Sequence, residues 1–233
     1  MLFKAVTTIS SVPLRIRRNK IQIRNNTMKT EFVSKDYTVG QLNAMVKKLI
    51  EQVGKKGPDL LLQGKLKIEV VKESILNWLD ITTTSATTEK FVAKDKFIKD
   101  SKEIKFYGFY GSFEEDFLVG NGKTEEPLSE QELRYGNLTK NSVDSPIIEE
   151  LGGEAKAETT LTELHNLLRK QGNGEEGDLL TSGYSNIFYT RNTNGVLRAV
   201  NVYWDDAGWG VRAYSVESPY DWDAGDRVFS RNS

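Results

Sequence analysis

The 233-residue sequence predicts an α+β protein, with a helical N-terminal part followed by a mixed antiparallel β-rich part. Three observations predict this fold class. Residues 186–216 contain two turn signals between runs rich in β-branched and aromatic residues, which is typical of a β-meander. Residues 157–171 show helical spacing of leucines, so we expect the meander to pack on this helix. A hydrophobic content of 38% is enough to form a core.

The C-terminal meander has the clearest β signals. Asn194-Gly195 is a pair that tolerates positive φ in a tight hairpin, and Asp206-Ala207-Gly208 supplies a second, longer turn. Between these turns the chain alternates from Val196 to Trp204, but neither face of the alternation is wholly polar. We therefore expect this strand to lie in the interior of the sheet.

Residues 1–27 differ from the rest of the chain because they contain several arginines and no acidic residue. This composition superficially resembles an organellar transit peptide. Alternatively, the biological start lies at Met28 and the leader is an upstream extension of the reading frame. We favour a disordered or non-native leader over a functional address.

Residues 28–80 are predicted to form a helical, basic subdomain. Thr38–Gly54 has an N-cap residue, a helical apolar stripe and a terminal glycine. A short helix over Pro58–Gln63 and a strand over Lys65–Val71 are expected next, and Lys72–Leu79 has the spacing of another helix. The Thr-rich stretch 81–88 is predicted to be a connector to the second domain.

Residues 89–233 are predicted to form an α+β domain. A short helix should begin near Pro146 and end at Gly152-Gly153, and a longer amphipathic helix should span 157–171. Residues 120–132 are polar and are expected to form a loop. The strand candidates, besides the meander, are Glu89–Lys94, Ile104–Tyr110, Phe113–Val119, Leu133–Thr139 and Arg227–Ser230.

The net charge of −1 conceals an asymmetry between the two halves of the chain. Residues 1–110 contain 21 Lys and Arg against 11 Asp and Glu, a net charge of +10, and the remaining residues carry −11. Such a split can mark a nucleic-acid-binding half, or the two halves can simply attract each other. The basic binding candidates are Lys47, Lys48, Lys55 and Lys56.

Composition excludes several kinds of chemistry. The chain has no cysteine, so disulfides, thiol nucleophiles and thiolate metal sites are excluded, and a reducing compartment such as the cytoplasm is expected. No run of about 18 apolar residues is present, so we expect no membrane span.

No cofactor motif is complete. Gly122-Lys123-Thr124 resembles the end of a phosphate-binding loop, but Phe117 replaces the required first glycine.

His165 is the only histidine, and we interpret it as a half-buried helix residue, because zinc sites need several nitrogen or sulfur ligands. The segment from Asp221 to Asp226 resembles the start of a calcium loop, with Asp221, Asp223 and Asp226 as weak ligand candidates. Its glycine is misplaced, so a turn is favoured and no metal is predicted.

Aromatic side chains are dense near the C-terminus, and they can stack on nucleobases or sugars or can fill a core. The candidates for binding are Trp204, Trp209, Tyr220 and Trp222. Nearby carboxylates suggest a second hypothesis, a hydrolase of carbohydrate-type ligands, because two carboxylates suffice for glycoside chemistry. These carboxylates are Asp205, Asp206, Glu217, Asp221 and Asp223.

The strings TTEKFVAKDKF, NIFYTRNTNGVLRAVNVYW and DDAGWGVRAYSVESPYDWDAGDRVFSRNS resemble a family of uncharacterised hypothetical proteins from small-genome, candidate-phyla bacteria. The resemblance covers most of residues 37–233 and does not include 1–27. It implies no activity and no catalytic residue. The charge asymmetry, the Lys-rich helix over 42–56 and the lack of a complete catalytic constellation lead us to expect a non-catalytic binding or interaction module with a protein or nucleic-acid partner, and the hydrolase is the alternative.

Overall fold

The computed structural model describes residues 2–7, 66–71 and 74–232, together with seven single positions between 44 and 63. The chain divides into two compact units, Met1–Glu73 and Ser74–Ser233. In the first unit, β1 (Leu2–Thr7) pairs antiparallel with β2 (Leu66–Val71). β2 matches the predicted strand, and β1 lies in the leader that we expected to be disordered or non-native.

Most of the predicted N-terminal helices lie outside the described residues. Of the helix expected over Thr38–Gly54, the structure describes Ala44, Lys47, Ile50 and Glu51 as helical and exposed, and also Gly54. Lys48, Lys55 and Lys56 are not described. The part of the chain that the structure describes contains no helix long and apolar enough to cross a membrane.

The second unit is built on a mixed seven-stranded sheet with the order β3-β7-β11-β8-β9-β10-β5. Most neighbours are antiparallel, but β11 with β8 and β10 with β5 are parallel. The strands are β3 (Leu76–Thr84), β5 (Phe106–Gly111), β7 (Gln131–Leu138), β8 (Asn186–Arg191), β9 (Leu197–Asp205), β10 (Gly208–Ser215) and β11 (Arg227–Arg231). A two-stranded sheet joins β4 (Phe91–Val92) to β6 (Thr124–Glu125).

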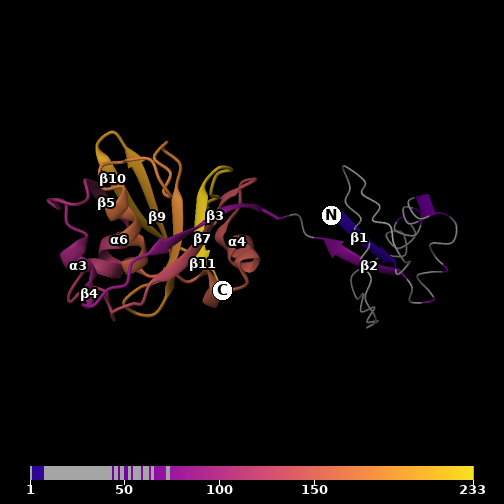
Figure 1. Ribbon diagram of the computed structural model, residues 1–233, viewed down its shortest axis with the longest axis horizontal. Helices are drawn as coiled ribbons and strands as arrows, with labels where there is room; N and C mark the ends of the chain where they lie inside the picture. The colour runs from indigo at the N-terminus through magenta and orange to yellow at the C-terminus, as the bar shows by residue number, and fades with distance from the viewer. Residues whose placement is uncertain are drawn as a thin grey trace. The chain divides into compact units, whose positions relative to one another are not determined.

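Helices pack on both faces of the large sheet at the first part of β9, which explains why both faces of this strand carry buried apolar residues. On one face, leucines of α6 (Leu161–Lys170) share a hydrophobic cluster with Val200, Val202 and Trp209. On the other, α4 (Asp144–Leu151) and α5 (Glu154–Ala157) share a cluster with Leu197 and Ala199. α4 and α6 accordingly lie on opposite sides of β9, which is an interior strand as predicted (Figure 1).

Two predicted elements have the wrong conformation. The helix predicted over Lys72–Leu79 is wrong, because β3 begins at Leu76 and pairs with β7 up to Thr84, with a bulge at Leu79. The predicted connector 81–88 is shorter than expected, because Ile81–Thr84 belong to this strand. Phe113–Val119 is not a strand but contains a π-helix, η1 (Glu114–Leu118), which places Phe113 and Phe117 together in the core.

Other boundaries differ by a few residues. The candidate strand Glu89–Lys94 contributes only the two residues of β4 before α3 (Ala93–Lys96). The helix predicted from Ala157 begins at Leu161, because Thr160 caps it and forms a reciprocal capping box with Glu163. Residues 120–132 form a loop apart from β6 and the first residues of β7.

Candidate functional site

A cavity of about 360 Å³ opens on the sheet face that carries α4. Its wall contains four aspartates, an asparagine, an arginine, two serines and three aromatic residues, and we call it the Trp222 cavity. The lining residues are Asp144, Ser185, Asn201, Arg212, Tyr214, Ser218, Tyr220, Asp221, Trp222, Asp223 and Asp226.

The sheet register places the floor of the Trp222 cavity. Asn201 follows Leu197 and Ala199 at intervals of two along β9, so its side chain lies on the same face. Arg212 is the direct partner of Asn201 on β10. The opposite wall comes from a bridge between Ser142 and Trp222, which brings the start of α4 to the C-terminal turn.

Asn201 is the most informative residue of this wall. Its side chain is 4% exposed, and its Oδ1 atom has no hydrogen-bond partner. Among the described residues, two other buried side-chain atoms lack a hydrogen bond, on Glu163 and Arg198, but both face an ion-pair partner. A buried acceptor without any partner costs about 1–3 kcal/mol, so the Oδ1 of Asn201 needs a donor from a water molecule or from a ligand in the cavity.

Asp144 is the second buried polar group of the cavity. Its Oδ1 accepts hydrogen bonds from the indole nitrogen of Trp222 at 2.7 Å and from the hydroxyl of Tyr189 at 2.8 Å. Burial raises the pKa of the Asp144 carboxyl, and these two hydrogen bonds oppose the rise. A carboxyl with a raised pKa can carry a proton and then donate a hydrogen bond as well as accept one.

The remaining carboxylates of the cavity have different surroundings. Asp226 accepts from the backbone nitrogens of Ser185 and Asp223 at 2.8 and 2.9 Å, so it stabilises the turn. Asp223 accepts from the amide of Asn141 at 3.0 Å. Asp221 has no hydrogen bond to any described residue and is open to a ligand. Among the described residues, no group of His, Cys, Asp or Glu is arranged to hold a metal, and the three calcium candidates form no such group.

Arg212 is the single cationic side chain of the cavity wall. Its guanidinium donates to the hydroxyl of Tyr203 at 2.9 Å and lies 4.5 Å from the centre of that ring. The pKa of Arg212 is raised although burial acts to lower it, because Tyr214 and Tyr203 oppose that effect. Arg212 and the carboxylate of Asp221 line the same wall, so the cavity contains both signs of charge.

The predicted aromatic candidates separate into two groups. Tyr220 and Trp222 line the cavity, with Tyr220 80% exposed at its rim. Trp209 is fully buried in the cluster on the α6 side and donates to the carbonyl of Gln171, so its interpretation as a binding residue is wrong. Trp204 packs edge-on against Trp209, below Lys105, and does not line the cavity.

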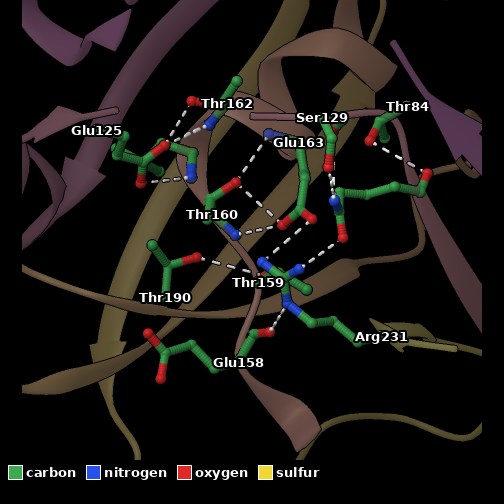
Figure 2. A network of polar contacts seen from close by, with 12 residues as sticks. Thr84, Glu125, Ser129, Glu158, Thr159, Thr160, Thr162, Glu163, Thr190 and Arg231 are labelled. Atoms are coloured by element: carbon green, nitrogen blue, oxygen red, sulfur yellow. Dashed lines mark hydrogen bonds and ion pairs between the residues drawn. The ribbon is translucent and has the colours of Figure 1, made fainter. Parts of the chain in front are cut away.

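Two further candidates have structural roles. His165 is more buried than predicted and packs edge-on against the rings of Phe91 and Phe97, with ring centroids 5.5 and 5.7 Å away. Burial, with Lys96 and Arg169 nearby, lowers the pKa of His165 to about 4. The rejected phosphate-loop segment ends beside Glu125, and that carboxylate instead accepts hydrogen bonds from Leu161 and Thr162 at the start of α6 (Figure 2).

No family model, curated protein or solved structure matches this chain. The resemblance to a family of candidate-phyla proteins therefore stays a prediction. The site has to be interpreted from its own geometry.

Proposed function

We propose that the unit Ser74–Ser233 is a binding module whose Trp222 cavity takes an uncharged, hydroxyl-rich ligand of the carbohydrate class. The observation that carries this proposal is the buried, unpartnered Oδ1 of Asn201 in the cavity wall. An acceptor of this kind is matched by a ligand hydroxyl, which both donates and accepts.

The balance of charge supports an uncharged ligand. Asp226 and Asp223 are bonded within the protein, and Asp144 has a raised pKa. The carboxylates of Asp221, Asp223 and Asp226 outnumber the one cation of the wall, Arg212, so the cavity disfavours an anionic ligand. A phosphate-bearing ligand would meet Asp221 and Asp223 at the entrance, which disfavours nucleic acid at this site. Tyr220 and Trp222 offer the apolar surface that sugar rings contact.

Ligand-detected NMR on the full chain tests this proposal. The probes are glucose, galactose, mannose and N-acetylglucosamine, with a short DNA duplex and a single-stranded RNA at low salt for comparison. We expect saturation transfer to at least one sugar. Asn201→Leu should abolish the transfer, since it removes the acceptor, while Asn166→Leu on α6, across the sheet, should leave it unchanged.

Absence of transfer to every sugar, or equal transfer with Asn201→Leu, would contradict the proposal. Binding of DNA or RNA that weakens steeply with salt would favour a nucleic-acid partner instead.

A carboxylate-dependent hydrolase is the second candidate function. Asp221 and Asp223 share the concave wall with Asp144, whose raised pKa suits a general acid. Asp205, Asp206 and Glu217 do not line this cavity. Release of reducing sugar from an oligosaccharide, lost in both Asp144→Asn and Asp221→Asn, would support hydrolysis. Binding without turnover would support the module alone.

A further inference from the structure

We infer that the ligand extends out of the Trp222 cavity over a tyrosine platform on the same sheet face, and that it is therefore an oligosaccharide chain rather than a single sugar. This inference rests on the proposed function. The tyrosine platform consists of Tyr203 on β9 and of Tyr107 and Tyr110 on β5, with Arg212 between them on β10.

The pairing register of β9, β10 and β5 places residues of the cavity wall next to residues of the platform. Arg212 is the direct partner of Asn201 on β9 and of Tyr110 on β5. These three side chains therefore form one row across the sheet, from the cavity wall to the edge strand. With neighbouring strands about 4.8 Å apart, the row crosses roughly 10 Å, which exceeds one sugar ring.

Two glycines let the rings lie over the sheet. In the next row, Gly210 is the partner of both Tyr203 and Gly108. A Cβ atom at Gly210 would lie 2.3 Å from Cζ of Tyr203, and one at Gly108 would lie 2.4 Å from the hydroxyl of Tyr110. Both rings thus occupy the space that side chains would fill: the ring of Tyr203 lies across β10, and the ring of Tyr110 lies back along its own strand β5.

A bulge in β5 adds the third ring. The register between β10 and β5 shifts at Tyr107, and its ring centroid lies 6.0 Å from that of Tyr110. Bulges commonly re-aim a side chain next to a binding site. Tyr107 and Tyr110 are 47% and 37% exposed, although aromatic rings of this size are usually better buried.

The platform has the chemistry of a sugar-binding surface. The exposed rings of Tyr107 and Tyr110 provide apolar surface, and the guanidinium of Arg212, which lies over the ring of Tyr203, provides hydrogen-bond donors beside them. Arg212 contacts Tyr203 and Tyr110 at 4.5 and 5.6 Å from the ring centres and also lines the cavity, so one side chain belongs to both surfaces. A chain of sugars fits this continuous surface.

Isothermal titration of the full chain with each monosaccharide and its β-1,4-linked tetrasaccharide tests the inference. We expect the tetrasaccharide to bind on the order of tenfold tighter than the monosaccharide, from one added ring contact. Tyr110→Ala should lose this gain and keep the monosaccharide affinity, while Tyr110→Phe should keep both. Trp78→Ala, an exposed aromatic residue on the opposite edge strand β3, should behave as wild type.

Equal affinity for the monosaccharide and the tetrasaccharide would contradict binding over the tyrosine platform. A gain in affinity that survives in Tyr110→Ala would contradict it too. In both cases the cavity proposal would still stand. Absence of binding at every length would instead overturn the proposed function, and the platform with it.

Discussion

Asp144 is buried with its two hydrogen-bond donors, the hydroxyl of Tyr189 and the indole nitrogen of Trp222. This burial makes the stability of the folded protein depend on pH. Because its folded-state pKa is raised above the ordinary value of 3.8, the folded protein keeps this proton where the unfolded chain has released it. The contribution to stability is full below about pH 3.8 and is lost as the pH rises through the folded value.

Asp144→Asn should remove this pH-dependent loss of stability. The amide stays neutral and its Oδ1 still accepts from Trp222 and Tyr189. The free energy of unfolding, measured by urea denaturation from pH 3 to 8, should decline less with rising pH in the variant than in wild type. Parallel curves for the two proteins would contradict a raised Asp144 pKa.

His165 should act on stability in the opposite direction. Its pKa falls to about 4 in the folded state from 6.5, so the unfolded chain binds the extra proton between these values. Stability is fully present above about pH 6.5 and falls by roughly 3 kcal/mol as the pH drops through the folded value. In His165→Leu the stability difference between pH 7 and pH 4.5 should shrink, and an unchanged difference would refute this origin.

Single residues of the site were predictable only where local sequence contains the signal. Tyr220, Asp221 and Trp222 were identified because aromatic and acidic residues follow each other closely in the chain. Asn201 and Asp144 were missed, because one is an ordinary residue of an apolar strand and the other begins a helix. Strand register and the Ser142–Trp222 bridge bring them together, and neither is visible in a local pattern.

At the scale of elements, α6 is anchored by a carboxylate from a distant strand. Both oxygens of Glu125 on β6 accept from α6: the backbone nitrogens of Leu161 and Thr162 at 3.0 and 2.8 Å, and the hydroxyl of Thr162 at 2.6 Å (Figure 2). These nitrogens belong to the first turn, which has no partner within the helix. Glu125 therefore ties the small sheet to the helix.

Glu125→Ala should destabilise the protein by about 2 kcal/mol, because it leaves helix N–H groups unsatisfied and removes a negative charge from the helix N-terminus. Glu126→Ala is the matched control, since the ion pair that Glu126 forms with Lys90 is exposed to solvent. That change should cost less than about 0.5 kcal/mol. Equal thermal unfolding temperatures of the two variants would show that the hydrogen bonds to Glu125 do not stabilise α6.

Helices and strands could be predicted where the turn residues and the spacing of apolar residues indicate the same structure. β8, β9 and β10 were identified because Asn194-Gly195 and Asp206-Ala207-Gly208 separate them. β3 was missed, because Ile75, Leu76 and Leu79 match helical spacing while its partner β7 lies some fifty residues further along the chain. At η1 the sequence contains the helical interval of four between Phe113 and Phe117, although we predicted a short strand there.

At the scale of the whole molecule, the unit boundary at Ser74 makes β3 part of the second unit. Residues 74–233 should unfold in one cooperative transition and keep the sugar binding of the full chain. Residues 89–233 lack β3, leave β7 without its antiparallel partner and lose the buried Leu76, Thr82 and Thr84. We expect this shorter fragment to melt at a clearly lower temperature or to aggregate. Equal melting temperatures would place the boundary after β3.

The central claim is that Asn201 and the Trp222 cavity receive a sugar. An ¹H–¹⁵N NMR titration of the full chain with the best-bound saccharide tests it most directly, because the side-chain amide of Asn201 and the indole N–H of Trp222 report from the cavity wall. The account predicts that these two signals shift together and saturate, while the buried indole of Trp209 across the sheet stays in place. Saturating shifts elsewhere on the protein, with Asn201 and Trp222 unmoved, would contradict it.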